Sequence, residues 1–193
     1  MNPFHATTRL CAGLVTVVLA ACATPGPGPS STADDPIHRH ALVRTTSPAP
    51  DWAALRADLV AVAAALPGIE ISPVDHQGIN LQIPVADGFP SGSTDIRPSL
   101  ARALDAIAPI LADRPGAAVQ VIGHTDSQGS EMVNLRLSIA RAEAVVEHLR
   151  QRGIGLERLS ADGRGEADPL TSNATEEGRA RNRRVELLLR NMP

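Results

Sequence analysis

Residues 123–142, GHTDSQGSEMVNLRLSIARA, combine a strand end, a polar turn and a helix that carries one charge on its apolar side. That charge is Arg141, because helical steps of four place it between Leu137 and Val145 on a stripe that should face a sheet. A guanidinium withdrawn from water needs an anionic partner. Asp126 lies in the turn before the helix and is placed to supply one.

Two interpretations of this pair are open. Asp126 and Arg141 could form a salt bridge that fixes the helix to its loop. Alternatively, both could face a cleft and bind a zwitterion, with the carboxylate on an ammonium and the guanidinium on a carboxylate. The loop follows the carboxyl end of a strand, where open α/β sheets commonly bind ligands, and residues 127–129 would add backbone N–H donors.

Two long patterns follow each other along the chain. The first, TDxxGxxxxNxxLSxxRA, begins at Thr125, and the second contains GxGE from Gly163 and NRRVE from Asn182. Both stand as in the OmpA-like peptidoglycan-binding family, which the chain resembles over about residues 79–190. The resemblance implies an α/β (α+β) fold in two layers, ordered β-α-β-α-β-β, with helices packed on a mixed sheet.

The resemblance also implies a ligand, the diaminopimelate of the peptidoglycan stem peptide, bound without covalent chemistry. Asp126 and Arg141 would hold its charged groups, and Asn134 would order the loop. The other ligand-binding positions carried over by matching are Phe89, Pro90, Leu137, Thr125 and Gly129. Pro90 stands where many relatives have an acid, so a polar contact from that position is not expected.

Two other classes of function compete with wall binding. In a metal hydrolase, His124 and Asp126 could ligate zinc and Glu131 could act as base. Only two ligands are in view and no nucleophilic set is assembled, so we expect no enzyme, no metal and no cofactor. In a scaffold of a secretion or motility apparatus, residues 52–66 would form the partner surface.

Arg183 and Arg184 match the arginines of the family's NRR pattern. They could contact the ligand, or they could brace the last strand against acids such as Glu166 or Glu176. We expect the bracing role.

The remaining elements follow from periodicity and caps. Asp51 should cap a helix over residues 52–66, whose apolar stripe packs on the domain or on a second copy. The stripe of Leu100, Leu104, Ile107 and Leu111 predicts a second helix from Pro98. Strands are expected at 69–71, 79–83, 119–122, 159–161 and 185–189, and further helices at 131–152 and 175–181. The strand-helix-strand repeats predict parallel pairing.

The first 21 residues predict a signal peptide, because Arg9 precedes an apolar run, residues 10–21, that is too short to span a bilayer. Residues 19–22, LAAC, resemble the lipobox of bacterial lipoproteins, in which Cys22 would be acylated and become the N-terminus. An ordinary signal peptide is the alternative. Ala23 after the cysteine suggests, by family analogy, sorting to the outer membrane with the domain in the periplasm.

Residues 22–50 are rich in Pro, Gly, Ser and Thr and predict a flexible tether. Residues 51–78 would form a helix and hairpin that lead into the binding domain at 79–193. Because Cys11 lies in the segment that is removed, the mature chain would keep one acylated cysteine and form no internal disulfide.

Composition excludes a nucleic-acid partner. Aromatic residues make up 2% of the chain, which leaves no stacking platform, and the net charge is −3. All 18 basic residues are arginines, interspersed with 21 acids, so no basic patch follows. The expected partners are peptidoglycan, the membrane through Cys22 and other envelope proteins.

Overall fold

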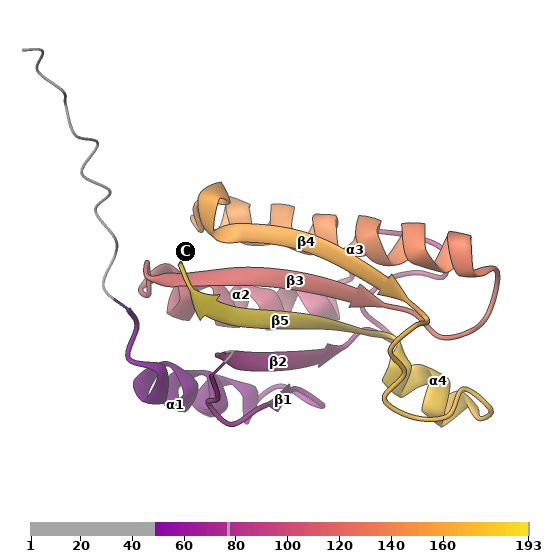
Figure 1. Cartoon of the computed structure of the whole chain (residues 1–193), viewed down its shortest axis with the longest axis horizontal. Coiled ribbons are helices and arrows are strands. Elements are labelled where there is room, and N and C mark those ends of the chain that lie inside the picture. Colours follow the sequence, from indigo (N-terminus) through magenta and orange to yellow (C-terminus); the bar gives the residue numbers. More distant parts are fainter. Residues whose placement is uncertain (1–48, 77, 193) are drawn as a thin grey trace, which may run out of the picture. The chain divides into compact units, whose positions relative to one another are not determined.

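A five-stranded mixed sheet with helices on one of its faces forms the described part of the chain, residues 49–76 and 78–192 of a computed structural model (Figure 1). The predicted signal peptide, the anchor at Cys22 and nearly all of the tether lie outside these residues. In chain order the elements are α1 (Trp52–Ala63), β1 (Glu70–Ile71), β2 (Ile79–Pro84), α2 (Pro98–Ala112), β3 (Ala117–His124), α3 (Glu131–Gln151), the 3-10 turn η1 (Leu156–Arg158), β4 (Leu159–Gly165), α4 (Glu176–Asn182) and β5 (Arg184–Asn191).

The strand order is β1-β2-β5-β3-β4, so the last strand of the chain lies in the middle of the sheet. β3 pairs with β4 in parallel, and β5 runs antiparallel to both β2 and β3. β2, β3 and β4 therefore point the same way, as the crossovers predicted. Direct parallel pairing is limited to β3 and β4, because β5 separates β2 from β3. The mixed sheet is confirmed.

The first helix packs on the domain's own core. Asp51 caps it by accepting hydrogen bonds from the N–H groups of Ala53 and Ala54 at 3.1 and 3.0 Å. Leu55 and Leu59 are fully buried in the core. α1 ends three residues before the predicted limit, because Leu66 precedes a proline and the α conformation is disfavoured there.

Aliphatic side chains fill the space between helices and sheet. The predicted α2 stripe is buried as expected, and it meets the odd-numbered residues of the central strands, among them Leu81, Val121 and Leu187. Each such side chain contributes roughly 1.5–3 kcal/mol when withdrawn from water. Within residues 49–76 and 78–192, no helix has the length and apolar composition needed to cross a bilayer.

Helix α3 lies unusually close to the sheet because two glycines face it. A Cβ at Gly123 would collide with the backbone of Ser138, and a Cβ at Gly163 would collide with the Ser138 hydroxyl. The hydroxyl of Ser138 accepts a hydrogen bond from the N–H of Gly165 at 2.9 Å. These contacts fix the first half of α3 against the ends of β3 and β4 and so position Arg141.

Candidate functional site

A cleft of about 500 Å³ opens beside the carboxyl end of β3. Its walls come from the segment between β2 and α2, the loop after β3 and the first half of α3. Six of the predicted ligand residues line it: Phe89, Thr125, Asp126, Asn134, Leu137 and Arg141. The other two, Pro90 and Gly129, are not among the lining residues.

Arg141 reaches the cleft from α3 and is only 7% exposed. Its Nε donates to the carbonyl of Ser93 at 3.1 Å and its Nη2 to the carbonyl of Pro90 at 3.3 Å, while the guanidinium carbon lies 5.0 Å from the centre of the Phe89 ring. Burial lowers the pKa of Arg141, and the charge of Asp126 partly offsets this, so the side chain stays cationic. Among the described residues Arg141 has no ion-pair partner.

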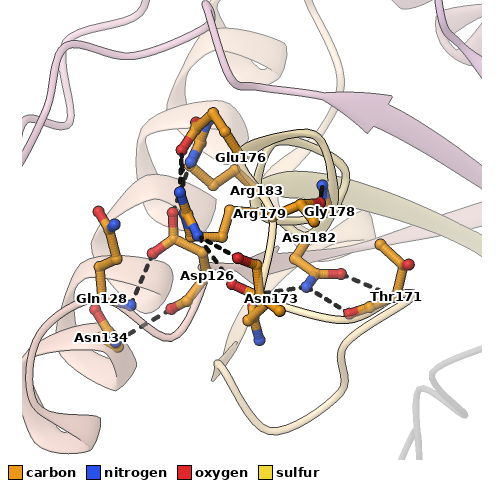
Figure 2. Close-up of polar contacts among 12 residues, drawn as sticks. Asp126, Gln128, Asn134, Thr171, Asn173, Glu176, Gly178, Arg179, Asn182 and Arg183 are labelled. Carbon is orange, nitrogen blue, oxygen red and sulfur yellow. Dashed lines mark hydrogen bonds and ion pairs between the residues drawn. The ribbon is translucent and has the colours of Figure 1, made fainter.

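Asp126 pairs with a different arginine. Its Oδ2 accepts a hydrogen bond from Nη1 of Arg183 at 2.7 Å, and its Oδ1 accepts one from the N–H of Gln128 at 2.9 Å (Figure 2). The salt bridge between Asp126 and Arg141, one of the two interpretations of the sequence, is therefore not formed. The bond from Gln128 also means that one of the backbone donors expected at residues 127–129 is already used.

Arg183 links the cleft to α4. Its Nη2 donates to Glu176 at 2.7 Å, so it braces the chain against this acid as predicted and holds Asp126 as well. Burial acts to lower the pKa of Arg183, but its bonds to Asp126 and Glu176 outweigh that effect and raise it. Arg184 points elsewhere and pairs with Glu186 at 2.7 Å rather than with Glu166 or Glu176.

Asn134 ties two loops together beneath the cleft. Its side-chain amide donates to the carbonyl of Asp126 at 3.2 Å and to Glu166 at 2.6 Å, contacts that fit its predicted role in ordering the loop. Thr125 is held by its backbone N–H, which donates to the carbonyl of Gly165 at 2.8 Å. Thr125 lines the cleft, and its buried hydroxyl has no hydrogen-bond partner in the described part of the chain.

His124 does not belong to the cleft. It is 4% exposed, and its Nε2 lies 3.5 Å from Glu186, beyond good hydrogen-bond geometry. Burial, with a further contribution from Arg184, lowers the pKa of His124 to about 4. Across the described ranges, no three His, Cys, Asp or Glu side chains are grouped as metal ligands, so the zinc hydrolase has no ligand set there.

Two further cationic residues line the cleft, Arg97 and Arg183. Ligand contact by Arg183 was considered from the NRR pattern, but the bracing role was expected. Arg97 was missed, and its place directly before Pro98 at the start of a helix gave no sign of a ligand site.

Comparison with known proteins finds one matching family and several relatives that are similar in sequence. The family described as "OmpA family" matches residues 88–183. The chain is 42% identical over 58% of its length to "Probable lipoprotein YiaD" of Escherichia coli, and 39% identical over 52% to "Peptidoglycan-binding protein ArfA" of Mycobacterium tuberculosis. It spans only 51% and 31% of these two relatives. "Outer membrane protein A" of Bordetella avium is 34% identical over 65% of this chain and 69% of that protein.

A solved structure of the same fold is titled "The structure of the cell wall anchor of the T6SS from Pseudomonas aeruginosa". It has a TM-score of 0.61 and 31% sequence identity and covers 72% of this chain and 97% of that chain. Neither this structure nor the three relatives carry the name of an enzyme, in agreement with the expectation of a binding protein.

Proposed function

The chain belongs to the OmpA family, and on that premise we propose that it binds peptidoglycan without covalent chemistry, through the cleft that Asp126 and Arg141 line. The ligand is the amino-acid end of diaminopimelate in the stem peptide. The observation that carries the proposal is Arg141, a buried guanidinium that opens on the cleft and has no ion-pair partner in the described residues.

The free donors of Arg141 suit a carboxylate. A guanidinium has five N–H donors in a planar fork, and Arg141 uses two of them, one on Nε and one on Nη2. The remaining donors include both hydrogens of Nη1 and the second hydrogen of Nη2. They form one edge that can bind a carboxylate through two parallel hydrogen bonds.

Asp126 supplies the opposite charge. A carboxylate offers about four acceptor positions, and Asp126 uses two, for Gln128 and Arg183. The others can accept from a ligand ammonium. Phe89 and Leu137 line the same cleft and offer apolar surface for the methylene groups of diaminopimelate. A neutral sugar would leave the charge of Arg141 unpaired, which is costly in a partly dry cleft.

The same proposal extends to the cell envelope. Acylated Cys22 would anchor the chain in the outer membrane, residues 23–50 would span the gap, and the domain would hold the wall in the periplasm. The LAAC sequence supports this, as does the relative named as a probable lipoprotein. Membership of a larger envelope machine, with residues 52–66 as a partner surface, stays a prediction.

Binding to purified walls tests the proposed ligand. The full-length chain should sediment with walls that contain diaminopimelate and bind poorly to walls that contain lysine at that position, because lysine keeps the ammonium but lacks the side-chain carboxylate. Walls matched for glycan and crosslinking serve as the comparison. Equal binding to both wall types would contradict recognition by Arg141.

The anchor needs a separate test. Cys22→Ser should abolish incorporation of labelled palmitate and release the protein from the membrane fraction or leave it unprocessed. Cys11→Ser is the matched control, because that residue lies in the predicted signal peptide. Palmitate retained by the Cys22 variant would contradict the lipid anchor.

A further inference from the structure

Positive charge exceeds negative charge in the cleft. Three arginines line it, Arg97, Arg141 and Arg183, together with a single acid, Asp126. Arg183 is occupied on both sides, since it bonds Asp126 at 2.7 Å and Glu176 at 2.7 Å. Glu176 also pairs with Arg179 at 2.8 Å, so these two acids and two arginines carry no net charge together. Arg141 and Arg97 are the positive charges that remain at the cleft.

Arg97 is held beside the Arg141 site by its backbone. Its N–H donates to the carbonyl of Gly88 at 2.9 Å, which closes the loop between β2 and α2. Phe89, next to Gly88, carries the guanidinium of Arg141 over its ring. The loop thus brings the positively charged side chains of Arg97 and Arg141 to one cleft.

The Arg97 side chain has no hydrogen bond or ion pair with the residues that the structure describes, and it is exposed. The acids of the same loop, Asp87 and Asp95, do not line the cleft, and the carboxylate of Asp95 accepts from the hydroxyl of Ser93 at 2.9 Å. No acid of this loop therefore neutralises Arg97 within the cleft.

A diaminopimelate end alone would not balance this site, because its ammonium and carboxylate cancel each other. We infer that Arg97 forms a second anion subsite, which binds a further carboxylate of the same stem peptide. The inference rests on the proposed function and adds a preference to it: the cleft takes a ligand with one ammonium and two carboxylates. Amidation of the second carboxylate should therefore lower the affinity of the cleft for the stem peptide.

Two groups of a stem tripeptide have this chemistry, the free carboxylate of its glutamate and its C-terminal carboxylate. Binding of soluble tripeptides to the full-length chain, measured by calorimetry, separates them. The probes are the free tripeptide and two forms amidated at one or the other position. Because Arg97 is exposed, its contact should be worth about fivefold in affinity at low salt.

Arg97→Gln should therefore bind the free tripeptide about fivefold more weakly than the unaltered chain does. Amidation at the recognised position should cost the unaltered chain the same factor and cost Arg97→Gln nothing further. Arg102→Gln is the matched control, because this arginine is also exposed on α2 but lies outside the cleft, and it should bind as the unaltered chain does.

The outcomes separate the two proposals. If the unaltered chain binds the free tripeptide and Arg97→Gln binds it equally well, the subsite is wrong and the proposed function stands. If amidation costs both proteins the same, the second carboxylate contacts some residue other than Arg97, and the subsite is again wrong. Failure of the unaltered chain to bind any tripeptide would overturn the proposed function and the subsite with it.

Discussion

Two arginines of this domain are equally buried but differ in how their donors are used. Arg141 in the cleft and Arg158 at the end of η1 are each 7% exposed, and burial lowers the pKa of both. Neither has an ion pair in the part of the chain that the structure describes. Arg158 donates to three backbone carbonyls at 2.7–2.8 Å, whereas Arg141 donates to two at 3.1 and 3.3 Å.

The difference lies in what the donors reach. The carbonyls bound by Arg158 belong to Leu111, Arg114 and Ala117, so it joins the C-terminal end of α2 to the start of β3. Carbonyls at the end of a helix attract a cation, and this guanidinium is used inside the fold. Arg141 keeps an unused edge that faces open volume. A buried arginine without a carboxylate partner therefore does not by itself indicate a ligand site. A buried arginine with unused N–H donors at a cleft does.

The largest effect should come from Arg158. Replacing it by methionine keeps much of the packing but removes three charge-assisted hydrogen bonds from a buried group, which should lower the free energy of unfolding by about 3–5 kcal/mol. The carbonyls of Leu111 and Arg114 each keep a backbone N–H donor. Urea unfolding of the full-length chain measures it, with exposed Arg164→Met as the matched control. The folded fraction should bind peptidoglycan normally. If the folded fraction bound peptidoglycan more weakly, Arg158 would not be purely structural, and its contrast with Arg141 would be wrong.

His124 extends the comparison to pH, because it lies two residues before Asp126 and yet belongs to the interior. Its pKa is about 4 when folded and about 6.5 when unfolded, so the unfolded chain binds the extra proton first. Stability should fall as the pH drops from about 6.5 to 4, by at most about 3 kcal/mol, and then level off for this group. Glu186, whose pKa is lowered by its hydrogen bonds and charges despite burial, adds a loss at lower pH.

Thermal unfolding of His124→Asn across this pH range checks the expectation. The variant should lose less stability between pH 6.5 and 4 than the unaltered chain does, since an amide takes up no proton. His148→Asn is a control, because His148 lies on α3 and pairs with Asp105 at 2.8 Å. Identical pH profiles for the unaltered chain and His124→Asn would show that His124 does not stay neutral in the fold.

The next effect concerns binding rather than stability. Arg141→Gln should weaken binding to diaminopimelate walls by about ten- to a hundredfold, because a charged hydrogen-bonded contact is worth roughly 1.5–3 kcal/mol. Water in the cleft can replace the missing donors, so the melting temperature should change little. Cosedimentation and thermal unfolding measure the two quantities. If the variant unfolds readily while its folded fraction binds normally, Arg141 has a structural role, like Arg158, and does not bind the ligand.

Much of this architecture could be predicted from periodicity. The stripe of α3 placed Arg141 on the buried side, and the turn before α3 placed Asp126 near it, as the structure confirms. Strand lengths were less predictable. β4 was expected to end at residue 161 but continues to Gly165, because Gly163 and Gly165 are strand positions at which α3 approaches closely.

The partner of Asp126 could not be predicted from spacing. The sequence offered Arg141 as a partner, in one of its two interpretations, because Arg141 lies on the helix that follows the loop. The actual partner, Arg183, is 57 residues away and comes to the cleft because β5 inserts between β2 and β3. Such an insertion depends on the pairing of distant strands, which local patterns do not report. For the same reason, the backbone carbonyls that Arg158 binds could not be predicted from the sequence.

The smallest effect should come from Arg183, whose expected role is intermediate between the structural role of Arg158 and the ligand-binding role of Arg141. It holds Asp126 at 2.7 Å and is partly exposed, so its loss should let the carboxylate rotate and weaken peptidoglycan binding by only about two- to threefold. Arg183→Gln tests this, with Arg181→Gln as the control from the helix α4 that Arg183 follows. If Arg183 acts by positioning Asp126, then Arg183→Gln should have no further effect in an Asp126→Asn background, because the side chain to be positioned no longer binds an ammonium. The same two- to threefold loss in both backgrounds would instead mean that Arg183 touches the ligand itself.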